Sequence, residues 1–304
     1  MDTAPEPADL PVVDIADMDF AAAGLDIEKA VAAYREHGCI VVRGFMKPHL
    51  EEMSRQINLV IGETIDQIEA AKPIPAGWLT PNGALLLPAP EHFERDKQIM
   101  CLPINYHNSA AFMRTAMDPT TLDLAEAILG PDIELFGDGQ SLVKEAFGGH
   151  PKHLHQDGAY FEHRYEGPLA QLTYVVDTNL ENGCLHAVPG SFKMGLLDHQ
   201  DTFSHLGLNE KTWPWERATP IEGKAGDSIF FHINCIHGSK PNRSSEPRPV
   251  FINRYRNAND YVIITTDDRK NPAEARKRAA AAASKENQKG LMVRGFRRHD
   301  ANRK

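Results

Sequence analysis

Three side chains of this sequence have the types and the spacing of a metal site. His155 and Asp157 stand one residue apart in the stretch KHLHQDGAYF, and His237 follows much later in CIHGSKPN. Residues i and i+2 of a β-strand point to the same face, so His155 and Asp157 can bind one metal ion together. Two imidazoles and one carboxylate leave several coordination positions open, which is the ligand set of non-haem Fe(II) oxygenases. The pattern therefore predicts an iron site that can also accept a co-substrate and O₂.

The residues after His237 make this prediction more specific, because one His-x-Asp pair in a chain with 14 histidines is weak evidence alone. Ser239 lies two residues after His237, and Arg248 comes after a turn-forming run rich in Asn, Ser and Pro. An arginine donates in pairs to a carboxylate, and a nearby hydroxyl adds one donor. We expect a hairpin that returns Arg248 to the level of His237, where it anchors the far end of a dicarboxylate co-substrate. His232 is the alternative third ligand, but the spacing to Arg248 favours His237.

Five segments of the sequence resemble the phytanoyl-CoA dioxygenase family of Fe(II)/2-oxoglutarate-dependent oxygenases. The ordered set extends over most of the chain between about residues 30 and 256, and its order is more specific than any one segment. The segments are AYREHGCIVVRGF (33–45), HQDGAYF (155–161), ENGCLHAVPGSFKMG (181–195), GDSIFFHINCIHGSKPN (226–242) and the strand that begins at Arg248.

The resemblance implies a fold and a set of site residues. The fold is mainly β with flanking α-helices, the cupin-like jelly roll called the double-stranded β-helix. The implied iron ligands are His155, Asp157 and His237. Arg248, helped by Ser239, is implied to bind the distal carboxylate of 2-oxoglutarate.

The chemistry implied by the resemblance uses Fe(II), 2-oxoglutarate as co-substrate and O₂. The co-substrate and O₂ are converted to succinate and CO₂ while a C–H bond of a second, small molecule is hydroxylated. Asp157 argues against halogenation, because related halogenases have a small residue here that makes room for chloride. Desaturation, cyclisation and endoperoxide formation can use the same ligands and stay open as alternatives. A jelly-roll protein that binds a metal or ligand without turnover is the remaining alternative.

Three further residues are candidates for contacts with the co-substrate or the substrate. Gln140 and Lys144 share one face of the strand that precedes the His-x-Asp motif, and either side chain can line the co-substrate pocket or reach solvent. Gln140 also resembles a co-substrate contact position of the family. Tyr160 follows Asp157 by three residues and is either a substrate contact or part of the packed core.

Strand alternation places Arg254 on the same face as Arg248. A buried arginine needs a partner, which is either an internal carboxylate such as Glu145 or an anionic group of the substrate. His163, just after the ligand strand, adds to the polar and cationic character of the site. These residues predict a small, polar or carboxylate-bearing substrate.

The elements that position the site change in type along the chain. Helical spacing of apolar residues comes first, and short β-rich runs with turn signals follow from about residue 133. This order predicts a single domain in which helices flank a β-sandwich or barrel. We expect a helical part (about 1–130), a jelly-roll core (about 131–266), and a basic C-terminal helix and tail (about 267–304). Within them we expect helices at 26–37, 48–71 and 119–129, and a lid loop at 72–110.

The composition, with 41% hydrophobic and 25% charged residues among 304, is ordinary for a globular protein. No run is long and apolar enough to span a membrane, and the acidic, Pro-rich start MDTAPEPADLP lacks the features of a secretion signal. The four cysteines lack metal-type spacing, so we expect reduced thiols in a cytoplasmic protein.

The net charge of −9 is unevenly distributed. From Asp268 onward, twelve Lys and Arg stand against four Asp and Glu. The basic run ARKRAAAAASKENQKG has no interleaved aromatic residues, so we expect a small-molecule substrate and no nucleic acid partner. The pattern predicts a helix that docks on the acidic surface of its own chain or of a second subunit, and the second arrangement is a homodimer.

Overall fold

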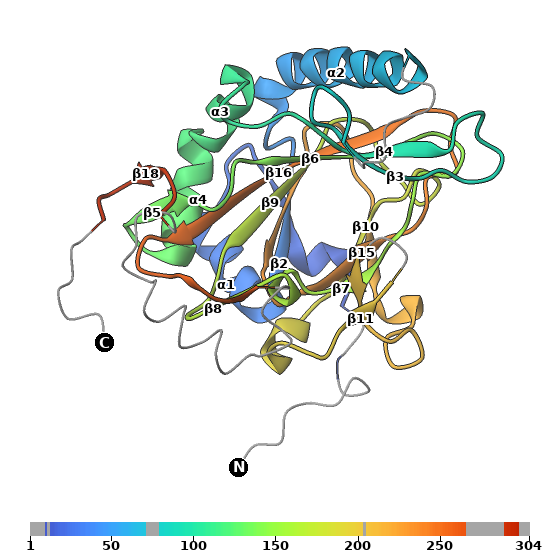
Figure 1. Cartoon of the computed structure of the whole chain (residues 1–304). Coiled ribbons are helices and arrows are strands. Elements are labelled where there is room, and N and C mark those ends of the chain that lie inside the picture. Colours follow the sequence, from blue (N-terminus) through green and yellow to red (C-terminus); the bar gives the residue numbers. More distant parts are fainter. Residues whose placement is uncertain (1–9, 11–12, 71–78, 203–204, 266–288, 298–304) are drawn as a thin grey trace.

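Two β-sheets and a set of flanking helices form the body of the protein (Figure 1). The computed structural model describes residues 10, 13–70, 79–202, 205–265 and 289–297. Within this part of the chain, the larger sheet has ten strands and the smaller one has four. Apolar side chains from both sheets share one buried cluster, so the sheets pack against each other as in the jelly roll that the resemblance implies.

The larger sheet follows the order β1-β2-β14-β9-β16-β6-β4-β3, and β5 joins it beside β16, with β18 on β5. Its strands are β1 (Asp19–Ala21), β2 (Cys39–Arg43), β3 (Leu85–Pro88), β4 (Lys97–Leu102), β5 (Ile133–Leu135), β6 (Gln140–Lys144), β9 (Leu169–Tyr174), β14 (Ser228–His232), β16 (Arg248–Asn257) and β18 (Met292–Arg294).

The smaller sheet has the order β13-β10-β15-β7. Two further strand pairs, β11 with β12 and β8 with β17, lie outside both sheets. The bounds are β7 (Lys152–His155), β10 (Leu185–Val188), β13 (Thr219–Ile221), β15 (Ile236–Ser239), β8 (Phe161–His163), β17 (Val262–Thr265), β11 (Gln200–Asp201) and β12 (Leu206–Gly207).

Side chains on the two faces of the larger sheet pack into different clusters. In β2, Ile40 and Val42 pack with the helices, whereas Cys39 and Val41 pack toward the smaller sheet. Both faces of β2 are therefore buried, which explains why its sequence CIVVR is apolar without alternation.

Four α-helices are seen in the described residues, and three of them were predicted. α1 (Ile27–His37) begins where Asp26 accepts a hydrogen bond from the Lys29 amide, and it ends at Gly38. Gly38 has φ of 73°, a left-handed conformation that favours glycine at the end of a helix. The others are α2 (Leu50–Ala70), α3 (Ala110–Ala116) and α4 (Pro119–Leu129), of which α3 was not predicted.

The helices cover the outer face of the larger sheet at two places. α1 and α4 share a buried cluster with β2 and β5, while α2 packs with β3, β4 and β16. Figure 1 shows α2 lying across one end of the molecule, above β3, β4 and β6. No helix in the described part of the chain is long and apolar enough to cross a membrane.

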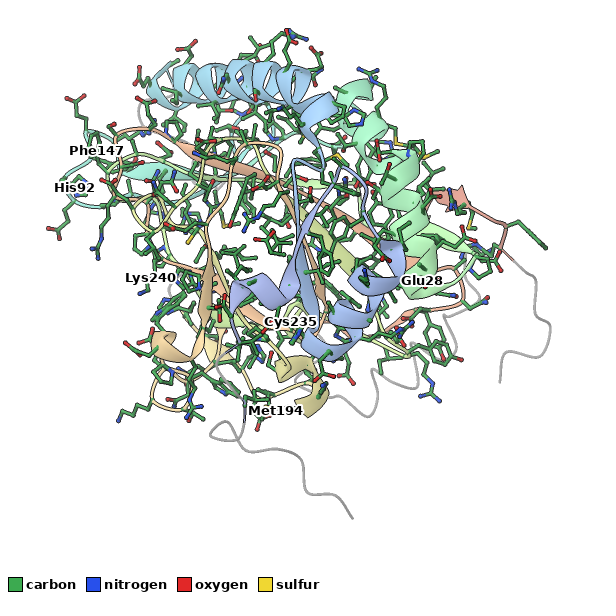
Figure 2. All side chains as sticks on the ribbon, turned by 180° about the vertical axis from the view of Figure 1, so that it is seen from behind. Glu28, His92, Phe147, Met194, Cys235 and Lys240 are labelled. Carbon is green, nitrogen blue, oxygen red and sulfur yellow. The ribbon has the colours of Figure 1, made fainter. Side chains whose placement is uncertain are left out.

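The segment expected to be a lid loop is partly a β-hairpin. β3 and β4 pair with each other, and β4 pairs with β6, so the hairpin extends the larger sheet. The loop that connects β3 and β4 lies against the turn after β6, because the His92 ring contacts the carbonyl of Phe147. Figure 2 shows these two residues together at the outer edge of the molecule. The residues from 71 to 78, which include part of the expected loop, lie outside the described residues.

The predicted C-terminal helix also lies outside the described residues. The following stretch, 289–297, contains the short strand β18, which was not predicted and which pairs with β5. Arg294 on this strand donates to Asp123 and Glu126 of α4. This basic stretch thus contacts acidic residues of its own chain.

Candidate metal and co-substrate site

His155, Asp157 and His237 meet at one point beside the smaller sheet. His155 on β7 and His237 on β15 are cross-strand partners, and their ring centroids are 4.4 Å apart. Each histidine Nε2 lies 3.7 Å from Asp157 Oδ1. All three residues are buried, and their three ligand atoms lie within 4.8 Å of one another. This geometry fits one metal ion, with the same three ligands that the sequence suggests.

Backbone carbonyls fix the tautomer of both histidines. His155 Nδ1 lies 2.7 Å from the His153 carbonyl, and His237 Nδ1 lies 2.9 Å from the Cys235 carbonyl. A carbonyl can only accept, so each Nδ1 carries the proton and each Nε2 keeps its lone pair for a metal. Burial lowers the pKa of both imidazoles, which favours the neutral form that a metal needs.

Asp157 is held by a tight turn and not by the strand. β7 ends at His155, and Asp157 begins a short 3₁₀-helix (Asp157–Ala159), so the expectation that both ligands share a strand was wrong. The side chain of Gln156 anchors this turn, because it donates to the Gly195 and Asn234 carbonyls. A strand that ends here lets the carboxylate turn toward both imidazoles.

Arg254 forms an ion pair with the candidate metal ligand. Its Nη2 and Nε lie 3.2 and 3.4 Å from Asp157 Oδ2, and its Nη1 donates to Gln140 Oε1 at 3.1 Å. The expected alternative partner Glu145 lies elsewhere, since it contacts Arg95 and the Ile99 amide. The partner is thus an internal carboxylate, although not the one expected.

A pair of buried cations lies at one end of the site. Lys144 on β6 and Arg248 on β16 are cross-strand partners, each only 4% exposed. Lys144 donates to the His150 and Ser239 carbonyls, and Arg248 donates to the Gly183 carbonyl. Among the described residues neither cation forms an ion pair, and Arg248 Nε has no hydrogen-bond partner. A carboxylate of 2-oxoglutarate fits this place, because it would neutralise the charge and accept from the free donor.

A cavity of about 600 Å³ connects these groups. It is bounded by both sheets, so a molecule in it can contact the metal ligands on one side and Arg248 on the other. All but one of the predicted site residues line it. They are His155, Asp157, His237, Ser239, Arg248, Gln140, Lys144, Tyr160 and Arg254.

His163 is the predicted site residue that lies outside this lining. Its ring packs 4.9 Å from the ring of Phe136, and its Nε2 lies 3.3 Å from Arg256 Nη1. Of the two candidates for the third ligand, the cavity contains His237, while His232 accepts a hydrogen bond from the Asn234 amide. Tyr160 lines the cavity, but its hydroxyl is already bonded to the Leu206 backbone.

Lys152 lines the cavity and was not predicted. Between the partners His237–His155 and Ser239–Lys152, β7 has one residue more than β15, which is a β-bulge. The bulge turns both His155 and Lys152 toward the cavity, although simple alternation would put them on opposite faces. Gly238 permits the bulge, because a Cβ atom at this position would lie only 2.7 Å from the Lys152 carbonyl oxygen. In the sequence, the only sign of the bulge was this glycine between the site residues His237 and Ser239.

Two aromatic rings form another part of the cavity wall. Phe136, which follows β5, and Phe161 on β8 have ring centroids 4.9 Å apart, and both line the cavity. The guanidinium of Arg254 lies 5.7 Å from the centre of the Phe161 ring. The sequence assigned these rings no role, because apolar residues in short strands are usually core.

Comparisons with known proteins identify the family of this chain. The family model described as phytanoyl-CoA dioxygenase matches residues 34–250. A probable alpha-ketoglutarate-dependent hypophosphite dioxygenase of Stutzerimonas stutzeri is 27% identical over 152 residues, which are 47% of this chain and 52% of that protein. The L-proline trans-4-hydroxylase of Streptomyces griseoviridis is 28% identical over 163 residues, which are 45% of this chain and 59% of the hydroxylase. The chain thus covers less than two thirds of either relative.

A solved structure has the same fold. It is the non-haem alpha-ketoglutarate-dependent carbocyclase SnoK from nogalamycin biosynthesis, with a TM-score of 0.60 and 18% identity. The match covers 81% of this chain and 90% of that one. At this identity the likeness shows the jelly-roll fold alone.

Proposed function

Because the chain belongs to the phytanoyl-CoA dioxygenase family, we propose that it is an Fe(II)/2-oxoglutarate-dependent dioxygenase that hydroxylates a C–H bond of a small molecule. One observation carries this proposal. A His-Asp-His site and a buried arginine that has no carboxylate partner among the described residues open into the same cavity. That combination provides a place for a metal and for a dianion that chelates it.

Each of these residues has a distinct role in the proposal. His155, Asp157 and His237 hold the Fe(II), which with 2-oxoglutarate supplies the activation of O₂. Arg248 donates to the distal carboxylate of 2-oxoglutarate, with the Ser239 hydroxyl beside it. The protein positions the co-substrate and keeps water from the reacting groups.

Two more polar residues complete the proposed co-substrate site. Lys144 adds a second nitrogen donor at the Arg248 end of the cavity. Gln140 presents its amide to the cavity while its oxygen accepts from Arg254. We assign both to the binding of 2-oxoglutarate.

The proposed substrate is a small, polar or carboxylate-bearing molecule. Lys152 supports this proposal, because its ammonium reaches only Met100 Sδ, at 3.8 Å, and forms no ion pair with a described carboxylate. Arg254 is a weaker candidate for contact with a substrate anion, since Asp157 already balances its charge. Tyr160, Phe136 and Phe161 offer apolar surface for the rest of the molecule. The hypophosphite and proline enzymes among the relatives have names that specify small polar substrates.

The proposal is tested by turnover with a panel of small anionic and zwitterionic molecules. We expect succinate release that requires Fe(II), O₂ and 2-oxoglutarate together, and a product heavier by one oxygen atom. A product that has lost two hydrogens would instead indicate desaturation or cyclisation at the same iron site. Protein that binds Fe(II) and 2-oxoglutarate but never releases succinate would favour the non-catalytic alternative.

Matched variants separate the two histidines considered as the third ligand. His237→Ala is expected to abolish Fe(II) binding and succinate release, because it removes a ligand. His232→Asn keeps an acceptor for the Asn234 amide and is expected to retain both. The reverse result would overturn the proposed ligand set.

A further inference from the structure

The two oxygens of the Asp157 carboxylate have different partners. Oδ1 lies 3.7 Å from Nε2 of both His155 and His237, in the place where a metal would bind. Oδ2 faces the other way and accepts from Arg254, at 3.2 Å from Nη2 and 3.4 Å from Nε. We propose that Arg254 is a positioning residue that confines Asp157 to metal binding through one oxygen. This inference rests on the proposed iron site.

The number of carboxylate oxygens on the metal decides how many positions remain open. Iron with two imidazoles and one carboxylate oxygen keeps three positions of an octahedron, enough for two co-substrate atoms and O₂. A carboxylate that binds through both oxygens takes one of those positions. An arginine that binds Oδ2 therefore keeps a coordination position of the metal open for the co-substrate.

Arg254 is itself held in place on several sides. Its Nη1 donates to Gln140 Oε1 at 3.1 Å, and its guanidinium packs over the Phe161 ring. Its side chain is 15% exposed. The backbone is paired on β16 with β9, where Arg254 lies opposite Ala170. A guanidinium fixed in this way cannot follow the carboxylate if Asp157 rotates, so it resists that rotation.

The positive charge of Arg254 is balanced by a carboxylate of the protein itself. Asp157 is an ion-pair partner of Arg254 at 3.2 Å, whereas Lys152 and Arg248 have no such partner among the described residues. Positioning of Asp157 explains Arg254 without any bound ligand. A role as the anchor of an anionic substrate would require breaking the existing ion pair.

The test uses Mn(II) as a redox-inert probe of the metal site. Mn(II) affinity is measured by calorimetric titration of the metal-free protein, and 2-oxoglutarate affinity is then measured on the Mn(II)-loaded protein. The variants are Arg254→Met, which removes the donors, and Arg254→Lys, which keeps one charged donor. Arg43→Met is the control, because Arg43 also lies in the larger sheet and pairs with a buried aspartate, Asp227, away from the cavity.

We expect Arg254→Met to bind Mn(II) or, once loaded, 2-oxoglutarate about 10- to 100-fold more weakly, the usual cost of losing a partner of a metal ligand. Arg254→Lys should recover part of the loss, and Arg43→Met should bind both like the wild type. Unchanged binding of both in Arg254→Met overturns the inference while the proposed function stands. A wild-type protein that binds neither Mn(II) nor 2-oxoglutarate overturns both.

Discussion

Lys144 and Arg248 lie directly opposite each other on neighbouring strands, both buried and neither paired with a carboxylate among the described residues. Like charges in this position repel each other, and burial adds a further cost. Burial and Arg248 together hold the pKa of Lys144 well below its usual value. The pair is thus a destabilising element in the empty protein, and an anion between them would relieve it.

The first prediction concerns Arg248. We expect 2-oxoglutarate to raise the thermal unfolding temperature of the wild type, because a ligand at 100 times its dissociation constant adds about 2.7 kcal/mol of stability. Arg248→Met should lose most of this rise and bind 2-oxoglutarate roughly 10- to 100-fold more weakly, as expected for lost charged hydrogen bonds. Without ligand, the variant should be as stable as the wild type or more so. A wild-type protein with no thermal shift would contradict the assignment of this end of the cavity.

The second prediction concerns the pH dependence of substrate binding. Burial lowers the pKa of Lys152 to about 8, so its ammonium is charged below that pH and neutral above it. If Lys152 binds an anionic group of the substrate, the KM for that substrate should rise as the pH increases beyond about 8. Lys152→Arg stays charged and should remove this rise, whereas the KM for 2-oxoglutarate should not depend on Lys152. A pH profile that is the same in both proteins would exclude this role.

The third prediction concerns stability in acid. Burial lowers the pKa of His150 to about 2 and that of His232 to about 4, against 6.5 in the unfolded chain. Both histidines are neutral in the folded protein. Their contribution to the free energy of unfolding is therefore complete above pH 6.5, and it is lost as the pH falls toward their folded-state pKa values. Between pH 6.5 and 4, each histidine should lower the free energy of unfolding by about 1.4 kcal/mol per pH unit.

Urea unfolding of the metal-free protein between pH 4.5 and 7 measures this slope. In His232→Asn, which has no titrating side chain at this position, the slope should fall by about one proton equivalent. An unchanged slope would mean that His232 is protonated in the folded state.

The fourth prediction concerns the buried carboxylate of Glu134. It is fully buried, accepts from Arg256 at 2.6 Å and from the Gly290 amide at 3.0 Å, and contacts Arg297. Glu134→Gln leaves two arginines without their counter-charge and should destabilise the protein by about 3 kcal/mol. Hydrogen exchange should also speed up in β18, because Glu134 holds the ends of the 289–297 stretch.

Glu126→Gln is the control for this experiment. Glu126 pairs with Arg294 of the same stretch, but its side chain is 41% exposed. The loss of such an exposed pair should cost less than about 1 kcal/mol. Equal effects of the two variants would show that burial of Glu134 does not matter.

The order of elements was accessible from sequence because it depends on local signals, and the three residues of the candidate metal site were named from their types and from the resemblance. α1 has an aspartate at its start and a glycine at its end, and β16 alternates so that Arg248 and Arg254 face one way. The jelly roll itself came from the resemblance, since periodicity alone does not distinguish it from other sandwiches.

The features that sequence reasoning missed depend on contacts between distant segments. Lys152 enters the cavity because of a bulge opposite Gly238, and a bulge is a property of two paired strands. Arg254 has Asp157 as its partner instead of Glu145 because the turn after β7 brings the carboxylate there. His163 has the right place in the chain but lies behind Phe136.

The two proposed histidine ligands and the proposed co-substrate anchor Arg248 belong to different sheets. His155, His237 and Ser239 are on the smaller sheet, while Lys144 and Arg248 are on the larger one. A co-substrate that chelates the metal and reaches Arg248 therefore cross-links the two halves of the sandwich. Without the co-substrate, the ion pair between Arg254 and Asp157 connects β16 to the turn after β7. A bound co-substrate should thus restrain the motion of one sheet relative to the other, because it adds a second connection between them.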